Sequence, residues 1–285
     1  MKRTFALLAL VLFVAFSASA QMDDKFYFPS KNMAPLGDLK FEEVSLPADT
    51  AQLTGIFLKP TKKPKATILF FHGAGGNVTS YTFMTRPLVE VGYQVMMIDF
   101  RGYGKSTGTP THLNIAKDGQ AVLNYLLQRK DVKGTKVILY GASMGSQIAV
   151  KLAKENEPKI AALVLDGTIS SFTDIALHHA PAEHHPMIKQ LPSPYAAKDD
   201  IKAVRKIPVL FIHSKEDREV PYTHTETVYN NAGGKKTLLV YEGKHLEAMK
   251  SDAPKVINAI NQLVTEKESA PPKTAQKQLG YRRVN

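Results

Sequence analysis

The sequence predicts one doubly wound α/β domain, built on a mostly parallel eight-stranded sheet with a short helical lid. Short apolar runs alternate with helical stretches along most of the chain. Six of these runs are apolar on both faces, as buried parallel strands are. The 285 residues are 44% hydrophobic and 22% charged, an ordinary globular composition that excludes a disordered chain.

The expected sheet begins with an antiparallel hairpin at one edge, formed by residues Phe41–Val44 and Gln52–Lys59 around Pro47-Ala48-Asp49. The six further runs are expected to pair in parallel, because a helical stretch separates most of them. In chain order these runs are Thr67–Phe71, Gln94–Phe100, Lys136–Tyr140, Ala161–Asp166, Pro208–His213 and Lys236–Tyr241.

Helices are expected between these strands. Their predicted ranges are Ser80–Val91, Thr111–Arg129, Met144–Asn156, Thr223–Asn231 and Asp252–Thr265. In the second of them, apolar residues such as Leu123 and Leu126 share one stripe, whereas Asp118 and Gln120 lie elsewhere on the helix.

One connection is long, with about 40 residues between Asp166 and Pro208, and residues 170–206 of it are predicted to form the lid. The lid contains four histidines, which are His178, His179, His184 and His185. They could hold a metal, line or cap a substrate pocket, or simply face solvent. The prolines among them interrupt regular structure, so no metal site is assigned.

The two ends of the chain are set apart from the domain, which spans residues 41–268. Residues 1–20 carry Lys2 and Arg3, then the apolar run Phe5–Phe16, which is shorter than the roughly 20 residues of a membrane span. They predict a signal peptide cleaved after Ala20, and a periplasmic or secreted protein. Residues 21–40 are expected to form an N-terminal extension, and residues 269–285 are expected to form a basic disordered tail.

The charge and composition of the chain limit the binding partners and the chemistry to be expected. The formal net charge is +11, but much of the excess lies in the two ends, so a nucleic-acid partner is not expected. A weak contact between the tail and an anionic surface remains open, and the oligomeric state is not predicted. The chain has no cysteine, which excludes disulfides, thiol nucleophiles and cysteine-bound metal sites.

The segment with the clearest chemistry is Gly141-Ala-Ser143-Met-Gly145, which joins an expected strand to an expected helix. This context is that of a nucleophile elbow, in which a strained turn raises the serine hydroxyl above the sheet. The turn leaves no room for a side chain at either glycine. Ser143 is therefore the candidate nucleophile, and the amide of Met144 a candidate oxyanion donor.

A second oxyanion donor is expected in the glycine-rich loop after Thr67–Phe71, where the amide of Ala74 is the candidate. Two nucleotide-binding motifs are rejected. The dinucleotide motif needs a third glycine where Val78 stands, and the phosphate-binding loop needs a glycine where Asp99 stands.

A serine nucleophile needs a base and an orienting acid, in the chain order Ser, Asp or Glu, His. His245 follows the last strand and is the candidate base, ahead of His213 at a strand end and of His224, which is expected on the surface. Asp217 is the favoured acid because it follows the penultimate strand. Asp166, at the end of the strand before it, is the rival.

Together these motifs resemble those of the α/β-hydrolase superfamily, in the serine-hydrolase branch of Bem46-like and monoacylglycerol-lipase-like proteins. The resemblance extends over about residues 41–265. It implies a Ser143, Asp217, His245 triad, with the Ala74 and Met144 amides as the oxyanion hole. The lysine and glutamate directly before Asp217 depart from the small residues that are usual in that loop.

The predicted reaction is hydrolysis of a small acyl ester or thioester through an acyl-enzyme, with no cofactor and no metal. Two alternatives stay open. One is a serine peptidase, and the other is a non-catalytic binding protein that keeps the hydrolase fold.

Overall fold

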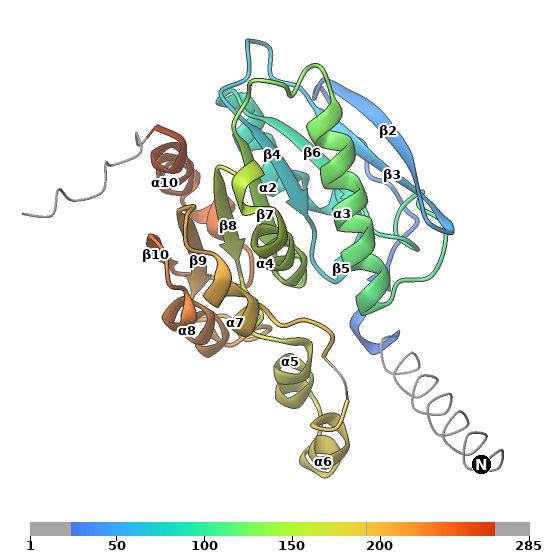
Figure 1. Ribbon diagram of the computed structural model, residues 1–285, viewed down its shortest axis with the longest axis vertical. Coiled ribbons are helices and arrows are strands. Elements are labelled where there is room, and N and C mark those ends of the chain that lie inside the picture. Colours follow the sequence, from blue (N-terminus) through green and yellow to red (C-terminus); the bar gives the residue numbers. More distant parts are fainter. Residues whose placement is uncertain (1–23, 192, 266–285) are drawn as a thin grey trace, which may run out of the picture.

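A computed structural model describes residues 24–191 and 193–265 (Figure 1). Eight strands form one sheet in the order β10-β9-β8-β7-β4-β6-β3-β2. The pairs β2·β3 and β3·β6 are antiparallel, and the other five pairs are parallel. The predicted fold class, an eight-stranded mostly parallel α/β sheet, is confirmed.

The strands lie close to their predicted positions. Their bounds are β2 (Phe41–Ala48), β3 (Ala51–Leu58), β4 (Thr67–Phe71), β6 (Gln94–Asp99), β7 (Val137–Ala142), β8 (Ala162–Asp166), β9 (Val209–Ser214) and β10 (Lys236–Tyr241). A separate pair joins β1 (Phe28–Pro29) to β5 (Gly75–Gly76) in parallel.

Two details of the strand prediction were wrong. Pro47 and Ala48 belong to β2 rather than to the turn, which is made by Asp49 and Thr50. A proline is tolerated there because β2 is an edge strand with one unpaired side. The strand β10 is the opposite edge. Only Leu239 and Tyr241 of its residues are buried, whereas the sequence predicted burial on both faces.

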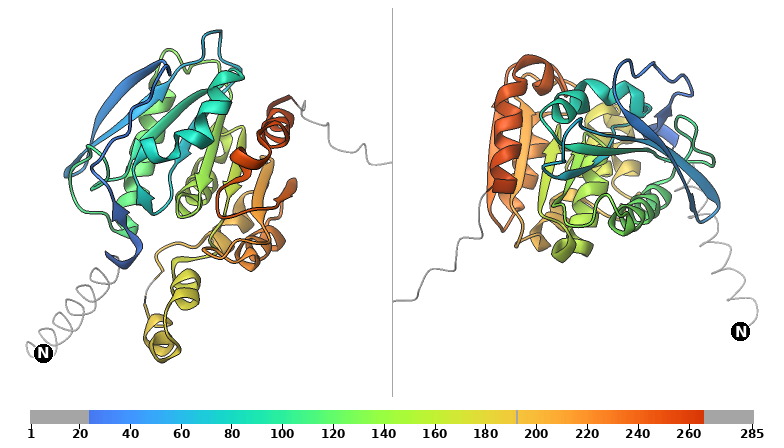
Figure 2. Two further views of the ribbon diagram at one scale, coloured as in Figure 1. Left: turned by 180° about the vertical axis from the view of Figure 1, so that it is seen from behind. Right: turned by 90° about the horizontal axis from the view of Figure 1, so that it is seen from above.

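Helices cover both faces of the sheet (Figure 2). The helices are α2 (Thr82–Glu90), α3 (His112–Gln128), α4 (Gly145–Asn156), α5 (Phe172–His179), α6 (His185–Ile188), α7 (Ala197–Asp200), α8 (Tyr222–Asn231), α9 (Ala248–Ser251) and α10 (Ala253–Thr265). Alternate residues of each central strand face opposite layers. Leu69 and Phe71 pack with α3 and α4, while Ile68 and Phe70 pack with α2 and α10.

Asp118 of α3 is fully buried, although the sequence placed it away from the apolar stripe. The guanidinium of Arg101 donates to both of its carboxylate oxygens, at 2.8 and 2.5 Å. A buried carboxylate is tolerated when a bidentate cation satisfies it. The pairing connects the loop after β6 to α3.

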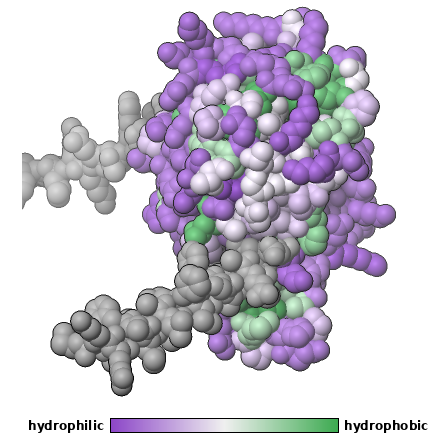
Figure 3. Space-filling model, turned by 90° about the vertical axis from the view of Figure 1, so that its right-hand side faces the viewer, coloured by the Kyte–Doolittle hydropathy of each residue, from purple (hydrophilic) through white to green (hydrophobic). Residues whose placement is uncertain are grey.

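Within the range predicted as the lid, α5 and α6 project from the end of the sheet and lie lowest in Figure 1. At the base of this projection, Lys198 forms an ion pair with Asp174 of α5 at 2.7 Å. On the face that Figure 3 presents, the surface is largely hydrophilic and apolar side chains occur in small scattered patches. Met187 of α6 is half exposed.

The predicted signal peptide with its cleavage site, and the basic tail, lie outside the described residues. Between residues 24 and 265, residue 192 aside, no helix has both the length and the apolar character needed to cross a bilayer.

Candidate active site

Ser143 stands in a sharp turn between β7 and α4, with φ of +52°. A β-carbon at Gly141 would lie 2.6 Å from the carbonyl oxygen of Gly145, and one at Gly145 would lie 2.1 Å from the carbonyl oxygen of Phe71. Glycine is therefore required on both sides of the serine. The Ser143 amide donates to the carbonyl of Asp166 at 2.8 Å, which ties the turn to the end of β8.

His245 follows β10, in a loop at the same edge of the sheet. Its Nδ1 lies 2.6 Å from Oδ2 of Asp217. The histidine side chain is 8% exposed and the aspartate side chain is fully buried. The structure thus brings together the histidine and the acid that the sequence favoured.

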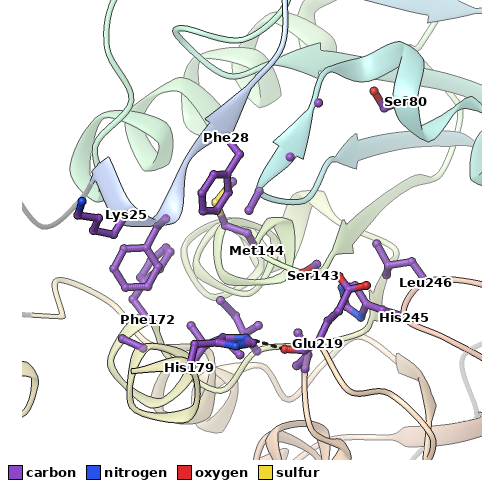
Figure 4. Close-up of a pocket in the computed structure, with 18 of the residues that line it drawn as sticks. Lys25, Phe28, Ser80, Ser143, Met144, Phe172, His179, Glu219, His245 and Leu246 are labelled. Atoms are coloured by element: carbon purple, nitrogen blue, oxygen red, sulfur yellow. Dashed lines mark hydrogen bonds between the residues drawn. The ribbon is translucent and has the colours of Figure 1, made fainter. Parts of the chain in front are cut away.

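His245 and Ser143 line the same pocket and lie beside one another in Figure 4. The backbone accounts for their proximity. Ser143 is bonded to the carbonyl of Asp166, and the next residue, Gly167, packs against the imidazole. A β-carbon on Gly167 would lie 2.6 Å from Cε1 of His245. Sequence reasoning missed Gly167, since its only signal is a glycine directly after a strand.

Asp217 is held by donors on both oxygens. Oδ1 accepts from the amides of Glu219 and Val220, each at 2.9 Å. Oδ2 lies 2.6 Å from His245 and 3.1 Å from Nε2 of His213. Burial by itself would raise the pKa of Asp217, but the hydrogen bonds from the two histidines outweigh it and hold that pKa well below its usual range. The carboxylate is therefore ionised at neutral pH.

His213, at the end of β9, is a second imidazole on this carboxylate. Its Nε2 also lies 2.9 Å from the carbonyl oxygen of Val220, and its Nδ1 lies 2.6 Å from Oγ1 of Thr225. A carbonyl can only accept, so Nε2 carries a proton and donates toward Asp217 as well. The sequence predicted that His213 lies at a buried strand end. It did not predict the contact with Asp217, four residues further along the chain.

Asp166, the rival acid, has a different partner. Its Oδ2 accepts from the hydroxyl of Tyr140 at 2.8 Å, and its Oδ1 has no hydrogen-bond partner among the described residues. Burial raises the pKa of Asp166 to about 6. The acid that contacts His245 is thus Asp217.

Ala74 and Met144, the candidate oxyanion donors, both line the pocket with Ser143. His72 orients the peptide before Ala74. Its Nδ1 donates to the carbonyl of Gly73 at 2.7 Å, and burial lowers the pKa of His72 to about 4, so the ring is neutral at pH 7. In a trans peptide the N–H is directed opposite to the carbonyl. The Ala74 amide is therefore directed away from His72.

The pocket has a volume of about 970 Å³ and a predominantly apolar lining. Its walls come from the N-terminal segment, the loop with Ala74, the turn with Ser143, the lid and the loop with His245 (Figure 4). The apolar side chains on these walls include Phe26, Phe28, Phe83, Ile169, Phe172, Ile175, Ile188, Val220 and Leu246. A volume of this size accommodates a drug-sized apolar ligand.

Two of the lid histidines contact backbone carbonyls. His179 lies 2.9 Å from the carbonyl oxygen of Glu219, and Nε2 of His185 lies 3.1 Å from the carbonyl oxygen of Ala180. No group of three histidine, aspartate or glutamate side chains that could hold a metal occurs within the described part of the chain. His224, expected on the surface, is buried at the lid base, where its Nδ1 accepts from the Ser170 amide at 3.1 Å.

Comparison with known proteins places this chain in a family. Residues 62–183 match the family described as Serine aminopeptidase, S33. The uncharacterized protein YfhR of Escherichia coli (strain K12) is 31% identical over 230 residues, which cover 78% of this chain and 80% of YfhR. The chain belongs to the α/β-hydrolase superfamily. Protein bem46 of Schizosaccharomyces pombe is 28% identical over 203 residues, or 70% of this chain and 68% of bem46.

Solved structures show the same fold for this α/β-hydrolase. The Pyrococcus furiosus esterase Pf2001 superposes with a TM-score of 0.68 at 19% identity, over 83% of this chain and 98% of that one. Est1E of Butyrivibrio proteoclasticus, solved with ferulic acid bound, has a TM-score of 0.66 at 17% identity, over 78% of this chain and 100% of its own. The predicted relationship to Bem46-like α/β-hydrolases is confirmed.

Proposed function

We propose that this α/β-hydrolase is a serine hydrolase that cleaves an acyl ester or thioester with Ser143, His245 and Asp217. One observation carries the proposal. His245 is bonded to a buried, ionised carboxylate on one side and lines the pocket of Ser143 on the other. An imidazole held in this way is the usual activator of a serine hydroxyl.

The protonation states follow from the contacts. The ionised carboxylate of Asp217 only accepts, so Nδ1 of His245 carries the proton of their shared hydrogen bond. Nε2 of the neutral ring then has a free lone pair. This lone pair takes the proton of Ser143, and Asp217 stabilises the imidazolium that forms.

The reaction proceeds in two halves. Ser143 Oγ attacks the substrate carbonyl carbon, the amides of Ala74 and Met144 stabilise the oxyanion, and His245 returns the proton to the departing alcohol or thiol. Water, deprotonated by His245, then attacks the acyl-enzyme, and the acid is released as Ser143 regains its proton. No cofactor takes part in these steps.

Esters and thioesters are favoured over amides as substrates. Alkoxide and thiolate leaving groups need less assistance than amines. One protein of the same fold is described as an esterase, and another was solved with ferulic acid bound. The apolar lining of the pocket fits an apolar acyl group.

A serine peptidase is the second candidate. The matching family is described as Serine aminopeptidase, and the carboxylate-bearing Glu219 lines the pocket close to His245 (Figure 4). A carboxylate in this position would attract the ammonium group of a free N-terminus. Amino-acid p-nitroanilides distinguish the two candidates, because a peptidase would cleave them and lose that activity in Glu219→Gln.

We further propose that the protein is exported to the periplasm or the medium, on the basis of the predicted signal peptide. Mass spectrometry of the protein from its native compartment should give a chain that begins at Gln21. If the basic tail contacts an anionic surface, deletion of residues 269–285 should abolish binding of the protein to that surface and leave ester turnover unchanged.

The serine hydrolase proposal is tested with a fluorophosphonate probe and p-nitrophenyl esters. Wild type should be labelled and should turn over esters, while Ser143→Ala and His245→Ala should lose roughly four to six orders of magnitude in kcat. The matched controls, Ser251→Ala on α9 and His184→Ala on the lid, should retain both activities. Absence of labelling and turnover in wild type would contradict the serine hydrolase proposal and favour a non-catalytic binding protein with the hydrolase fold.

A further inference from the structure

The segment before the domain is attached to the loop that carries Ala74. A short 3-10 helix at Asp24–Phe26 leads into β1, which pairs in parallel with β5. The amide of Phe28 donates to the carbonyl of Ala74 at 2.9 Å, and the amide of Ser30 donates to the carbonyl of Gly76 at 2.8 Å. The backbone of this segment is therefore held against the edge of the pocket.

Aromatic side chains anchor the same segment. Tyr27 is buried, and its hydroxyl lies 2.6 Å from Nδ1 of His112. The ring of Phe26 packs in T-shaped pairs with the rings of His112 and Phe172, at centroid distances of 4.9 and 5.5 Å. Phe172 begins α5, so these contacts connect the segment to α3 and to the lid. Such clusters of rings stabilise beyond their buried area.

Phe28 differs from its neighbours, because its side chain is left open to the pocket. The residue is 63% exposed, the highest value among the exposed large hydrophobic residues that the structure describes. Its ring projects from β1 into the pocket on the side of Met144 (Figure 4). Because the backbone is already fixed, covering this large apolar ring with an apolar ligand favours binding of that ligand.

We propose that residues Lys25–Phe28 form a specificity-determining wall of the pocket, on which the rings of Phe26 and Phe28 contact the apolar chain of a medium-length acyl group. This inference rests on the proposed serine hydrolase function and specifies its substrate. The ring of Phe28 would touch the acyl chain beyond the carbonyl carbon, so a two-carbon acetyl group would leave it uncovered. Preference for longer acyl groups would then depend on a residue outside the core of the domain.

The test compares p-nitrophenyl acetate with p-nitrophenyl octanoate. In Phe28→Ala the ratio of kcat/KM for octanoate to that for acetate should fall about tenfold, mainly through KM, since a few lost apolar contacts have an effect of that order. Phe28→Leu should restore most of the ratio. The matched control is Phe41→Ala, which removes a phenylalanine that is 44% exposed on the edge strand β2. It should leave the ratio unchanged.

A binding measurement keeps the inference separate from catalysis. Calorimetric titration of Ser143→Ala with decanoate should show binding, and adding Phe28→Ala should raise Kd about tenfold. If decanoate binding depends on Phe28 but the wild-type protein turns over no ester, the hydrolase function is refuted and the wall is supported. An unchanged octanoate ratio together with an unchanged Kd in Phe28→Ala, or no decanoate binding at all, would overturn the wall.

Discussion

Gly167 offers the sharpest test of the proposed geometry. Its φ is +60°, and a β-carbon there would lie 2.6 Å from Cε1 and 3.0 Å from Nδ1 of His245. Ordinary contacts begin at 3.4 Å, so in Gly167→Ala the imidazole must retreat by about 0.8 Å. A displacement of about 1 Å in a catalytic group costs roughly 10²-fold in rate. We therefore expect kcat for p-nitrophenyl acetate to fall about 10²-fold.

The control for this variant is Gly134→Ala. Gly134 also has a positive φ, of +81°, but no atom lies within 4 Å of the position of its added β-carbon. Both variants should lose about 1–2 kcal/mol of stability from the left-handed backbone, measured by urea unfolding. Only Gly167→Ala should lose activity. Equal activity losses, or turnover within twofold of wild type in Gly167→Ala, would refute the inferred contact between the glycine and the imidazole of His245.

Three further predictions concern buried carboxylates. Asp217→Asn should reduce kcat about 10⁴-fold and Asp166→Asn far less, as stopped ester assays would show; the reverse order would contradict the assignment of the acid. The folded pKa of Asp166, raised by burial to about 6 from 3.8, means that folding binds a proton between these values, so stability falls as pH rises from about 4 to 6. Asp166→Asn keeps an acceptor for Tyr140 and should therefore stabilise the fold by up to about 3 kcal/mol at pH 8 and little at pH 4; equal effects in urea titrations at both pH values would argue against this. Arg101→Met leaves Asp118 buried without its cation and should cost about 3–5 kcal/mol of unfolding free energy, whereas a loss below 1 kcal/mol would mean that the pair is solvated.

Several parts of the fold were predictable because they depend on local interactions. The alternation of apolar and helical runs placed each strand of the parallel sheet within two residues of its observed ends, because a strand buried on both faces must be apolar throughout. The turn at Ser143 was equally predictable from the sequence, since its steric requirement falls on Gly141 and Gly145, two positions away on either side. Where the prediction failed, at Pro47 and in β10, the position of a strand at the sheet edge was the deciding factor.

Other features depend on contacts between residues far apart in the chain. From the sequence, Asp118 is a polar residue away from the apolar stripe of its helix. Its burial is tolerated only because Arg101, from the loop after β6, donates to its carboxylate. His213 contacts Asp217 because the loop after β9 folds back over the strand end.

The sequence by itself determined the sheet, the turn that presents Ser143 and the histidine that follows the last strand, because each is specified by sterics or polarity within a short window. Only the tertiary structure decided which of two aspartates meets His245, and that the segment around Phe28 lines the pocket. Both depend on how distant loops are arranged at one edge of the sheet, and that arrangement is set by the packing of the whole domain.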